Sequence, residues 1–254
     1  MTRKITYTAL ALALIVAIPT FAQSSRRSNE FDFASDFSTL PVAANVPGLN
    51  GTFLTYLSIY NPTTTVYSVT ASLYDGSGVK RDATIQLGPG ETKTFTNFLS
   101  EVFNFTGGGA VTFAAPASPG GTHNNRFIIS SEVRTSGTHF STTVPVLEFA
   151  GSSSRSFAPG ITIDANSRTN AGCFNQGDTT NSVKIQLLNA SGAPTGPQVT
   201  LPLPPHAWGQ TAISANTVNG TVQFDPTDSA VCYAVVVDNA TGDGRFVSAT
   251  EYTP

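Results

Sequence analysis

The stretch of sequence that decides the fold occurs twice in this chain. Residues 56–87 read YLSIYNPTTTVYSVTASLYDGSGVKRDATIQL, and residues 170–201 read NAGCFNQGDTTNSVKIQLLNASGAPTGPQVTL. Aligned without a gap, matching residues lie 114 positions apart, as Asn61 and Asn175 do. Self-similarity over a strand-rich stretch indicates two copies of one structural unit.

Alternation along the matched segments predicts half-buried strands. Apolar and polar residues alternate over 69–73 and again over 183–187, so one face of each strand is expected to be exposed to solvent. On this alignment the match ends with Leu87 opposite Leu201. Similar short runs closed by Gly, Pro, Asn or Asp recur along the rest of the chain, at the density of a β-sandwich.

Two further patterns refine this prediction. The runs 127–129 and 235–237 lack alternation and are expected to be inner strands, and residues 97–103 have the spacing of one helical turn capped by Asn97. The sequence therefore predicts an all-β protein with two tandem antiparallel β-sandwich domains. The expected boundaries are a signal peptide at 1–22, a flexible lead-in at 23–39, the first sandwich at 40–150, a linker at 151–157 and the second sandwich at 158–254.

The start of the chain is typical of an export signal. Arg3-Lys4 precede an apolar run from Ala9 to Ile18, and the small-residue exit at Ala22 predicts cleavage after that residue. The run is shorter than the roughly 20 residues of a membrane span, so no transmembrane anchor is expected. The predicted location is outside the cytoplasm: secreted, periplasmic or at the cell surface.

Composition limits the classes of partner. Only 11 % of residues are charged and the net charge is −3, so a nucleic acid or an anionic membrane surface is not expected as a partner. A protein or a glycan at the cell surface fits better, and exposed strand edges would allow self-association.

The two cysteines, Cys173 and Cys232, both lie in strand-like segments of the second half. Export to an oxidising compartment favours a disulfide over two buried thiols. The first copy has Ile59 where the second has Cys173, so a bridge would belong to one domain, and the absence of a Cys-x-x-Cys pair speaks against redox chemistry.

Candidate ligand sites are few. Asp238 and Asp243 lie in one loop whose oxygen ligands could hold Ca²⁺, although Asx and Gly residues are also what a tight structural turn requires, and the turn is favoured. No other metal site and no other cofactor is expected. Trp208 with Tyr233 or Tyr252 could form a stacking platform for a sugar, against the alternative that Trp208 is packing.

Catalytic motifs do not emerge from the sequence. Neither a Gly-x-Ser-x-Gly elbow, nor a phosphate-binding loop, nor a metal-ligand cluster is found, so the chain is predicted not to be an enzyme.

Short motifs resemble a repeat of exported bacterial proteins. The resemblance implies a tandem immunoglobulin-like sandwich and no catalytic residue. In this chain Cys173 and Cys232 stand at positions where that repeat has apolar residues. The motifs are Arg168 to Gly172, Val235 to Asp243, Leu40 to Ala44, Gly51-Thr52 and Tyr60 to Pro62.

Three functional hypotheses follow. The first is a non-catalytic exported module for adhesion or protein interaction, and the second is a carbohydrate-binding protein that would need Trp208 exposed beside tyrosines. An outer-membrane β-barrel is a third, disfavoured by two separate turn-delimited repeats. Fold alone does not rank the first two.

Overall fold

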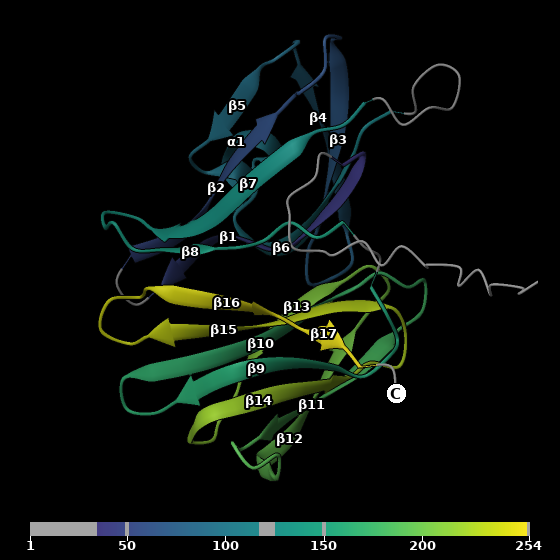
Figure 1. Ribbon diagram of the computed structural model, residues 1–254. Helices are drawn as coiled ribbons and strands as arrows, with labels where there is room; N and C mark the ends of the chain where they lie inside the picture. The colour runs from purple at the N-terminus through teal and green to yellow at the C-terminus, as the bar shows by residue number, and fades with distance from the viewer. Residues whose placement is uncertain (1–34, 49–50, 117–124, 149–150, 253–254) are drawn as a thin grey trace, which may run out of the picture. The chain divides into compact units, whose positions relative to one another are not determined.

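The computed structural model describes residues 35–48, 51–116, 125–148 and 151–252, which form almost entirely antiparallel β-structure (Figure 1). The all-β prediction is confirmed. The predicted signal peptide, residues 1–22, lies outside the described residues. Within the described ranges, no helix is long and apolar enough to cross a membrane.

The strands fall into two consecutive sets, which we name the first repeat and the second repeat. The first repeat consists of β1 (Phe37–Gly48), β2 (Gly51–Tyr60), β3 (Tyr67–Tyr74), β4 (Lys80–Leu87), β5 (Thr92–Phe95), α1 (Phe98–Phe103), β6 (Gly107–Ala114), β7 (Ile128–Thr135) and β8 (Ser141–Thr143). The second repeat consists of β9 (Ser156–Ile163), β10 (Ser167–Asn175), β11 (Asn181–Leu188), β12 (Pro194–Leu203), β13 (Trp208–Ala212), β14 (Thr217–Asp225), β15 (Ala230–Asp238), β16 (Gly244–Ser248) and β17 (Thr250–Glu251).

The two repeats share one strand order. In the first repeat the neighbours run β4-β3-β6-β1, and the pairing of β1 with the start of β2 continues the sheet as β2-β7-β8. β5 pairs with the end of β2, on the side of β2 away from β7. In the second repeat the neighbours run β12-β11-β14-β9-β17 and β13-β10-β15-β16. Adding eight to each strand number of the first repeat reproduces these orders with two exceptions. β1 and β2 pair in one continuous sheet, whereas β9 and β10 lie in different sheets, and β17 is an extra edge strand. The inner-strand prediction is confirmed for residues 235–237, which pair with both β10 and β16. Residues 128 and 129 of β7 pair with β2, whereas β8 pairs with β7 only at residues 132–134.

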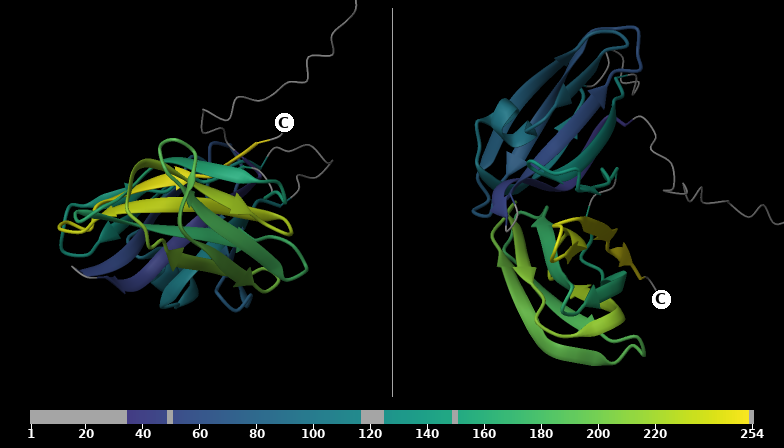
Figure 2. Two further views of the ribbon diagram at one scale, coloured as in Figure 1. Left: turned by 90° about the horizontal axis from the view of Figure 1, so that it is seen from below. Right: turned by 90° about the vertical axis from the view of Figure 1, so that its left-hand side faces the viewer.

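Each repeat has its own hydrophobic core, to which the alternating strands contribute as predicted. Val69 and Leu73 are buried in the first core, and Val183 and Leu187 are buried in the second. Fully burying one such aliphatic side chain contributes about 1.5–3 kcal/mol. The right-hand view of Figure 2 shows the strands of the second repeat, green to yellow, arranged in two layers.

A buried asparagine fixes the same turn in both repeats. The Nδ2 group of Asn61 donates to the backbone oxygens of Thr65 (2.8 Å), Leu87 (3.4 Å) and Gly88 (2.8 Å). The Nδ2 group of Asn175 donates to those of Thr179 (2.8 Å), Leu203 (3.3 Å) and Pro204 (2.8 Å). Because both asparagines are fully buried, their polar groups need these partners.

The hydrogen bonds of the asparagines correct one part of the sequence alignment. Leu203, and not Leu201, occupies the place of Leu87, since both Leu87 and Leu203 accept from the buried asparagine. The register of β11 against β12 shifts between Ile185 and Leu187, which accommodates two extra residues in β12, whereas β3 and β4 pair without a shift. Gly196, with φ +68°, lies within this bulge.

The first strand of each repeat begins earlier than the sequence predicts. β1 starts at Phe37, inside the segment 23–39 predicted as a flexible lead-in, and β9 starts at Ser156, inside the predicted linker 151–157. Pro41 and Pro159 lie within these strands, where proline is expected only at edges and bulges. β1 does shift register against β6 between Leu40 and Ala43.

The single predicted helical turn is present as α1. Asn97 caps it through a hydrogen bond accepted from the Ser100 backbone N–H (3.4 Å), and Glu101 Oε1 accepts from the backbone N–H of Asn97 (2.7 Å). This reciprocal arrangement resembles a capping box, with the glutamate one position later than usual. Phe98 and Leu99 bury the inner side of the turn against the first core.

Candidate functional site

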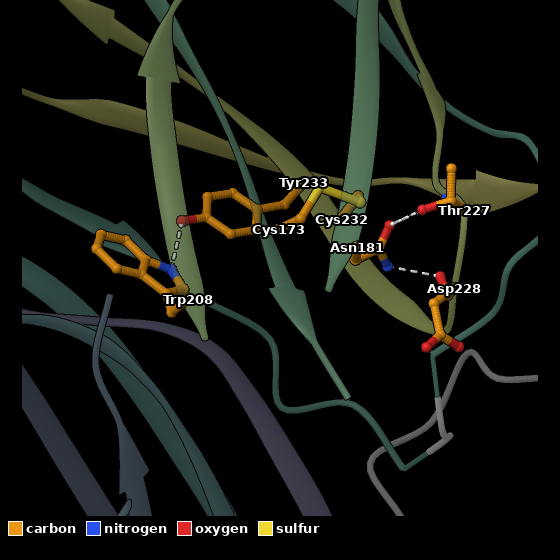
Figure 3. The surroundings of a disulfide bond; sticks show 7 residues. All are labelled: Cys173, Asn181, Trp208, Thr227, Asp228, Cys232 and Tyr233. Atoms are coloured by element: carbon orange, nitrogen blue, oxygen red, sulfur yellow. Dashed lines mark hydrogen bonds between the residues drawn. A yellow bond between two sulfur atoms is a disulfide. The ribbon is translucent and has the colours of Figure 1, made fainter. Parts of the chain in front are cut away.

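The cysteines of the second repeat are joined directly across one sheet. Cys173 on β10 lies opposite Cys232 on β15, with 4.1 Å between their Cα atoms, and the two form a disulfide (Figure 3). Nearby, the side chain of Asn181 accepts from the Thr227 backbone N–H (2.9 Å) and donates to the Asp228 carbonyl (2.7 Å). Both features hold segments of the second repeat together.

Trp208 and Tyr233, two of the predicted sugar-binding aromatics, lie together but face each other. The indole Nε1 of Trp208 donates to the Tyr233 hydroxyl at 3.0 Å, as Figure 3 shows, and that hydroxyl donates to Gln210 Oε1 at 3.0 Å. Tyr233 is fully buried, its ring stacks on Phe246 with 5.1 Å between centroids, and burial raises the pKa of its hydroxyl. The Tyr233 ring is therefore not available as a stacking surface.

Trp208 also connects the two repeats, whose residues belong to one compact unit. Its backbone N–H donates to the Asp75 carbonyl of the first repeat at 3.1 Å. Its ring lies so close to Gly108 that a Cβ atom added there would be 2.8 Å from Cη2. The half-buried indole thus acts as packing between the repeats.

Tyr252, the third predicted aromatic, lies apart from this pair. It follows β17 at the edge of the other sheet, is 62 % exposed, and contacts Phe157 edge-on with 6.5 Å between ring centroids. The three aromatics therefore do not form one platform.

The predicted calcium loop is organised by its own backbone. Asp238 Oδ1 accepts from the backbone N–H groups of Ala240 (2.9 Å) and Thr241 (2.8 Å) and from the Thr241 hydroxyl (3.0 Å). These hydrogen bonds, those from Thr241 first, lower the pKa of the Asp238 carboxyl. Asp243 Oδ1 accepts from the Gly244 backbone N–H at 3.0 Å. The residues that the structure describes contain no group of three or more His, Cys, Asp or Glu side chains placed to hold a metal ion.

We call the side of β13-β10-β15-β16 that points away from the core the outer face of the second repeat. This face is apolar, and the first repeat covers it. Val235, Val237 and Trp208 line a largely apolar cavity of about 210 Å³ together with Val42 and Val46 from β1. Asn170, Gln210 and Thr142 are among its few polar neighbours.

The equivalent outer face of the first repeat, on β5-β2-β7-β8, has a different character. Tyr56 and Ser58 of β2, with Ser130, Glu132 and Arg134 of β7, line a hollow of about 220 Å³ that is rich in polar groups. Strand register equates positions on the two faces: Tyr56 pairs with Glu132 as Asn170 pairs with Val235. The same position of the repeat is thus apolar and covered in one copy, and polar and open in the other.

Sequence reasoning missed this polar face. A usable signal was present, because Glu132 and Arg134 alternate with Val133 and differ from Val235 and Val237 of the second copy. Finding it required the register between β2 and β7, which places residues more than 70 positions apart side by side.

Comparison with known proteins adds no identification. No family model, no curated protein and no solved structure matches the chain.

Proposed function

We propose that this chain is an exported, non-catalytic protein of two tandem immunoglobulin-like β-sandwiches that mediates adhesion or protein interaction at the cell surface. The observation that carries the proposal is the contrast between the outer faces. In the second repeat this face receives another folded unit, the first repeat. In the first repeat the same face is open and holds a polar hollow. Within the part of the chain that the structure describes, this face is therefore the one we assign to a partner.

The immunoglobulin-like character is proposed at the level of architecture. In a constant-type immunoglobulin domain the second strand lies between the first and the fifth. Here the second strand of each repeat, β2 or β10, lies between the fifth and the seventh. Sandwiches of different strand order share the two-layer packing, and the loops and faces available for binding depend on that packing.

Export is supported by two features. The sequence begins with the pattern of a cleaved signal, and disulfides persist mainly in oxidising compartments outside the cytoplasm. The Cys173–Cys232 bridge fits such a compartment.

The non-catalytic part of the proposal is supported by how the predicted site residues are used. Trp208 packs between the repeats, Tyr233 is buried beneath it, and Asp238 closes a turn. Each therefore has a structural task, and the open face of the first repeat is formed by residues of rigid strands.

An adhesion assay tests the proposed function. Beads coated with the purified protein are expected to attach to cell surfaces, and Ser130→Tyr, which fills the open face, should abolish attachment. The matched control is Thr70→Tyr, because Thr70 is also an exposed strand residue with a hydroxyl but lies on β3, which pairs with β4 and β6 and not with the strands of the open face. Equal attachment of both variants would refute a role for the open face.

A further inference from the structure

The polar hollow of the first repeat is built on three neighbouring strands. Ser58 on β2 lies directly opposite Ser130 on β7 and Thr94 on β5, and the hydroxyls of Ser58 and Thr94 are 3.0 Å apart. Beneath them Leu57 and Ile59 are buried in the core. Alternation along the strand thus presents a row of hydroxyl groups on a rigid sheet.

A charged pair and an aromatic ring complete the hollow. Arg134 Nε donates to Glu132 Oε1 at 2.6 Å, and its guanidinium lies over the ring of Tyr56, 4.0 Å from the centroid. The Glu132 carboxylate and the Arg134 guanidinium cancel in charge, so the hollow attracts neither polyanions nor cations strongly. The cation–π contact and the ion pair hold these planar groups in place before any ligand arrives.

These residue types are not a requirement of the fold. The counterparts of Ser130, Glu132 and Arg134 in the second repeat are Tyr233, Val235 and Val237. Tyr233 is buried against Trp208 and Phe246, and the two valines line the cavity shared with the first repeat. A solvated face needs polar residues, but it does not need an ion pair stacked on a tyrosine beside a concave row of hydroxyls. The arrangement is therefore specific to the first repeat.

We propose that this hollow binds a neutral saccharide, through Glu132, Arg134, Tyr56 and the hydroxyls of Ser58, Thr94 and Ser130. The inference rests on the proposed function, since it names the ligand of the open face. A sugar ring offers adjacent hydroxyls that both donate and accept, which suits a carboxylate beside a guanidinium. Tyr56 contributes by holding the Arg134 guanidinium against its ring. The volume of about 220 Å³ lies below the roughly 300 Å³ at which drug-sized pockets begin, so the site suits a terminal ring.

A glycan array probed with the purified protein, followed by titration of the best neutral glycan, tests this inference. We expect binding that falls at least tenfold in Ser130→Tyr and several-fold in Glu132→Gln, which keeps the shape of the side chain. Thr70→Tyr should bind like the unmodified protein. Circular dichroism and thermal melting of each variant show whether it is folded, and Glu132→Gln provides the test if Ser130→Tyr does not fold.

The outcomes separate this inference from the proposed function. A silent array with folded protein, or binding that both hollow variants retain, would overturn the saccharide assignment. If attachment to cells is nevertheless lost in Ser130→Tyr, the open face binds a protein and the proposed function stands. If Ser130→Tyr instead changes the oligomeric state seen by sedimentation, a second copy of the chain occupies the face. If neither glycan binding nor attachment depends on the face, both proposals fail.

Discussion

The two repeats place different chemistry at the same position of one strand order. In the first repeat Ile59 on β2 lies opposite Ile129 on β7, and both side chains are buried. In the second repeat the corresponding pair across β10 and β15 is Cys173 and Cys232, joined covalently. The fold therefore needs a buried apolar pair at this place, and the disulfide is an addition that one copy carries.

The outer faces differ in the same way. Both copies need a buried core side, and both have one, but the opposite side of the same sheet is free to vary. The second repeat uses it for contact with the first repeat, and the first repeat uses it for a polar hollow. Residues that both copies share thus indicate what folding requires, and residues that differ on a common face indicate what each copy does.

The largest effect is expected from removing the disulfide. Cys173→Ala with Cys232→Ala should lower the free energy of unfolding of the second repeat by about 4 kcal/mol, because the bridge closes a loop across 59 positions. Denaturant titration of the variant, and of the unmodified protein with and without a thiol reductant, measures this. Identical transitions with and without reductant would show that the disulfide contributes nothing to the free energy of unfolding. The cysteine pair of the second repeat would then be energetically equivalent to the isoleucine pair of the first.

A smaller and equal effect is expected in both repeats at the buried asparagines. Asn61→Ala and Asn175→Ala should each cost roughly 3 kcal/mol at about 1 kcal/mol per hydrogen bond, because each removes the two Nδ2 hydrogens that serve three backbone carbonyls and the Oδ1 that accepts from a backbone N–H, of Thr63 or Gly177. Urea denaturation measures both, with Asn216→Ala, an exposed position, as the control. Strongly unequal losses would contradict the structural equivalence of the two turns.

Much of the repeat could be predicted from the sequence because its signals are local. The turn residues Asp75 and Asn189 act on groups two to four residues away. Asn61 and Asn175 act on a group four residues away and on groups fewer than 30 positions away, within the same repeat. The Asp75 carboxylate accepts from the Ser77 backbone N–H at 2.9 Å, and the Asn189 side chain accepts from that of Ser191 at 3.0 Å. Such motifs keep their spacing, so matching residues reveals them.

The parts that were missed depend on pairing between distant segments. The sequence Leu201-Pro202-Leu203-Pro204 offers two matches for Leu87-Gly88, and only the bulge in β12 selects the second. The prediction of an aromatic stacking surface for a sugar was wrong for a similar reason. Trp208, Tyr233 and Tyr252 were grouped because all three are aromatic residues of the second repeat. The strand order places Tyr252 after β17 on another sheet, and Tyr233 is buried.

At the junction, Trp208→Ala should cost about 2 kcal/mol, less than for a fully buried tryptophan, because the indole is half-buried. The change also leaves the Tyr233 hydroxyl without its donor. Calorimetry is expected to show a lower and broader transition, as the repeats unfold less cooperatively. The control is Thr92→Ala, since Thr92 is the counterpart of Trp208 in the first repeat and faces no junction. Equal melting of the two variants would argue against Trp208 as a link.

The smallest expected effect, at most about 1 kcal/mol for a partly exposed ion pair, concerns pH and distinguishes the two turns. Burial raises the pKa of the Asp75 carboxyl, but hydrogen bonds from Ser77, Arg81 and Val79 outweigh it and lower the pKa from 3.8 to about 2. The stabilisation by the ionised carboxylate is therefore present above about pH 4 and is lost as the pH falls towards 2. Asn189 closes the same turn in the second repeat without a titrating group.

Asp75→Asn, which gives the first turn the chemistry of the second, should therefore flatten the pH dependence of stability between pH 4 and pH 2. Urea midpoints at pH 5 and pH 2.5 measure this as a difference between the unmodified protein and the variant, because other carboxylates with lowered pKa values, such as Asp82 and Glu101, are common to both. Asn189→Asp is the reciprocal change, and it should introduce a pH dependence into the second repeat. If both proteins lose the same stability on acidification, Asp75 and Asn189 are interchangeable, and the two turns differ in sequence only.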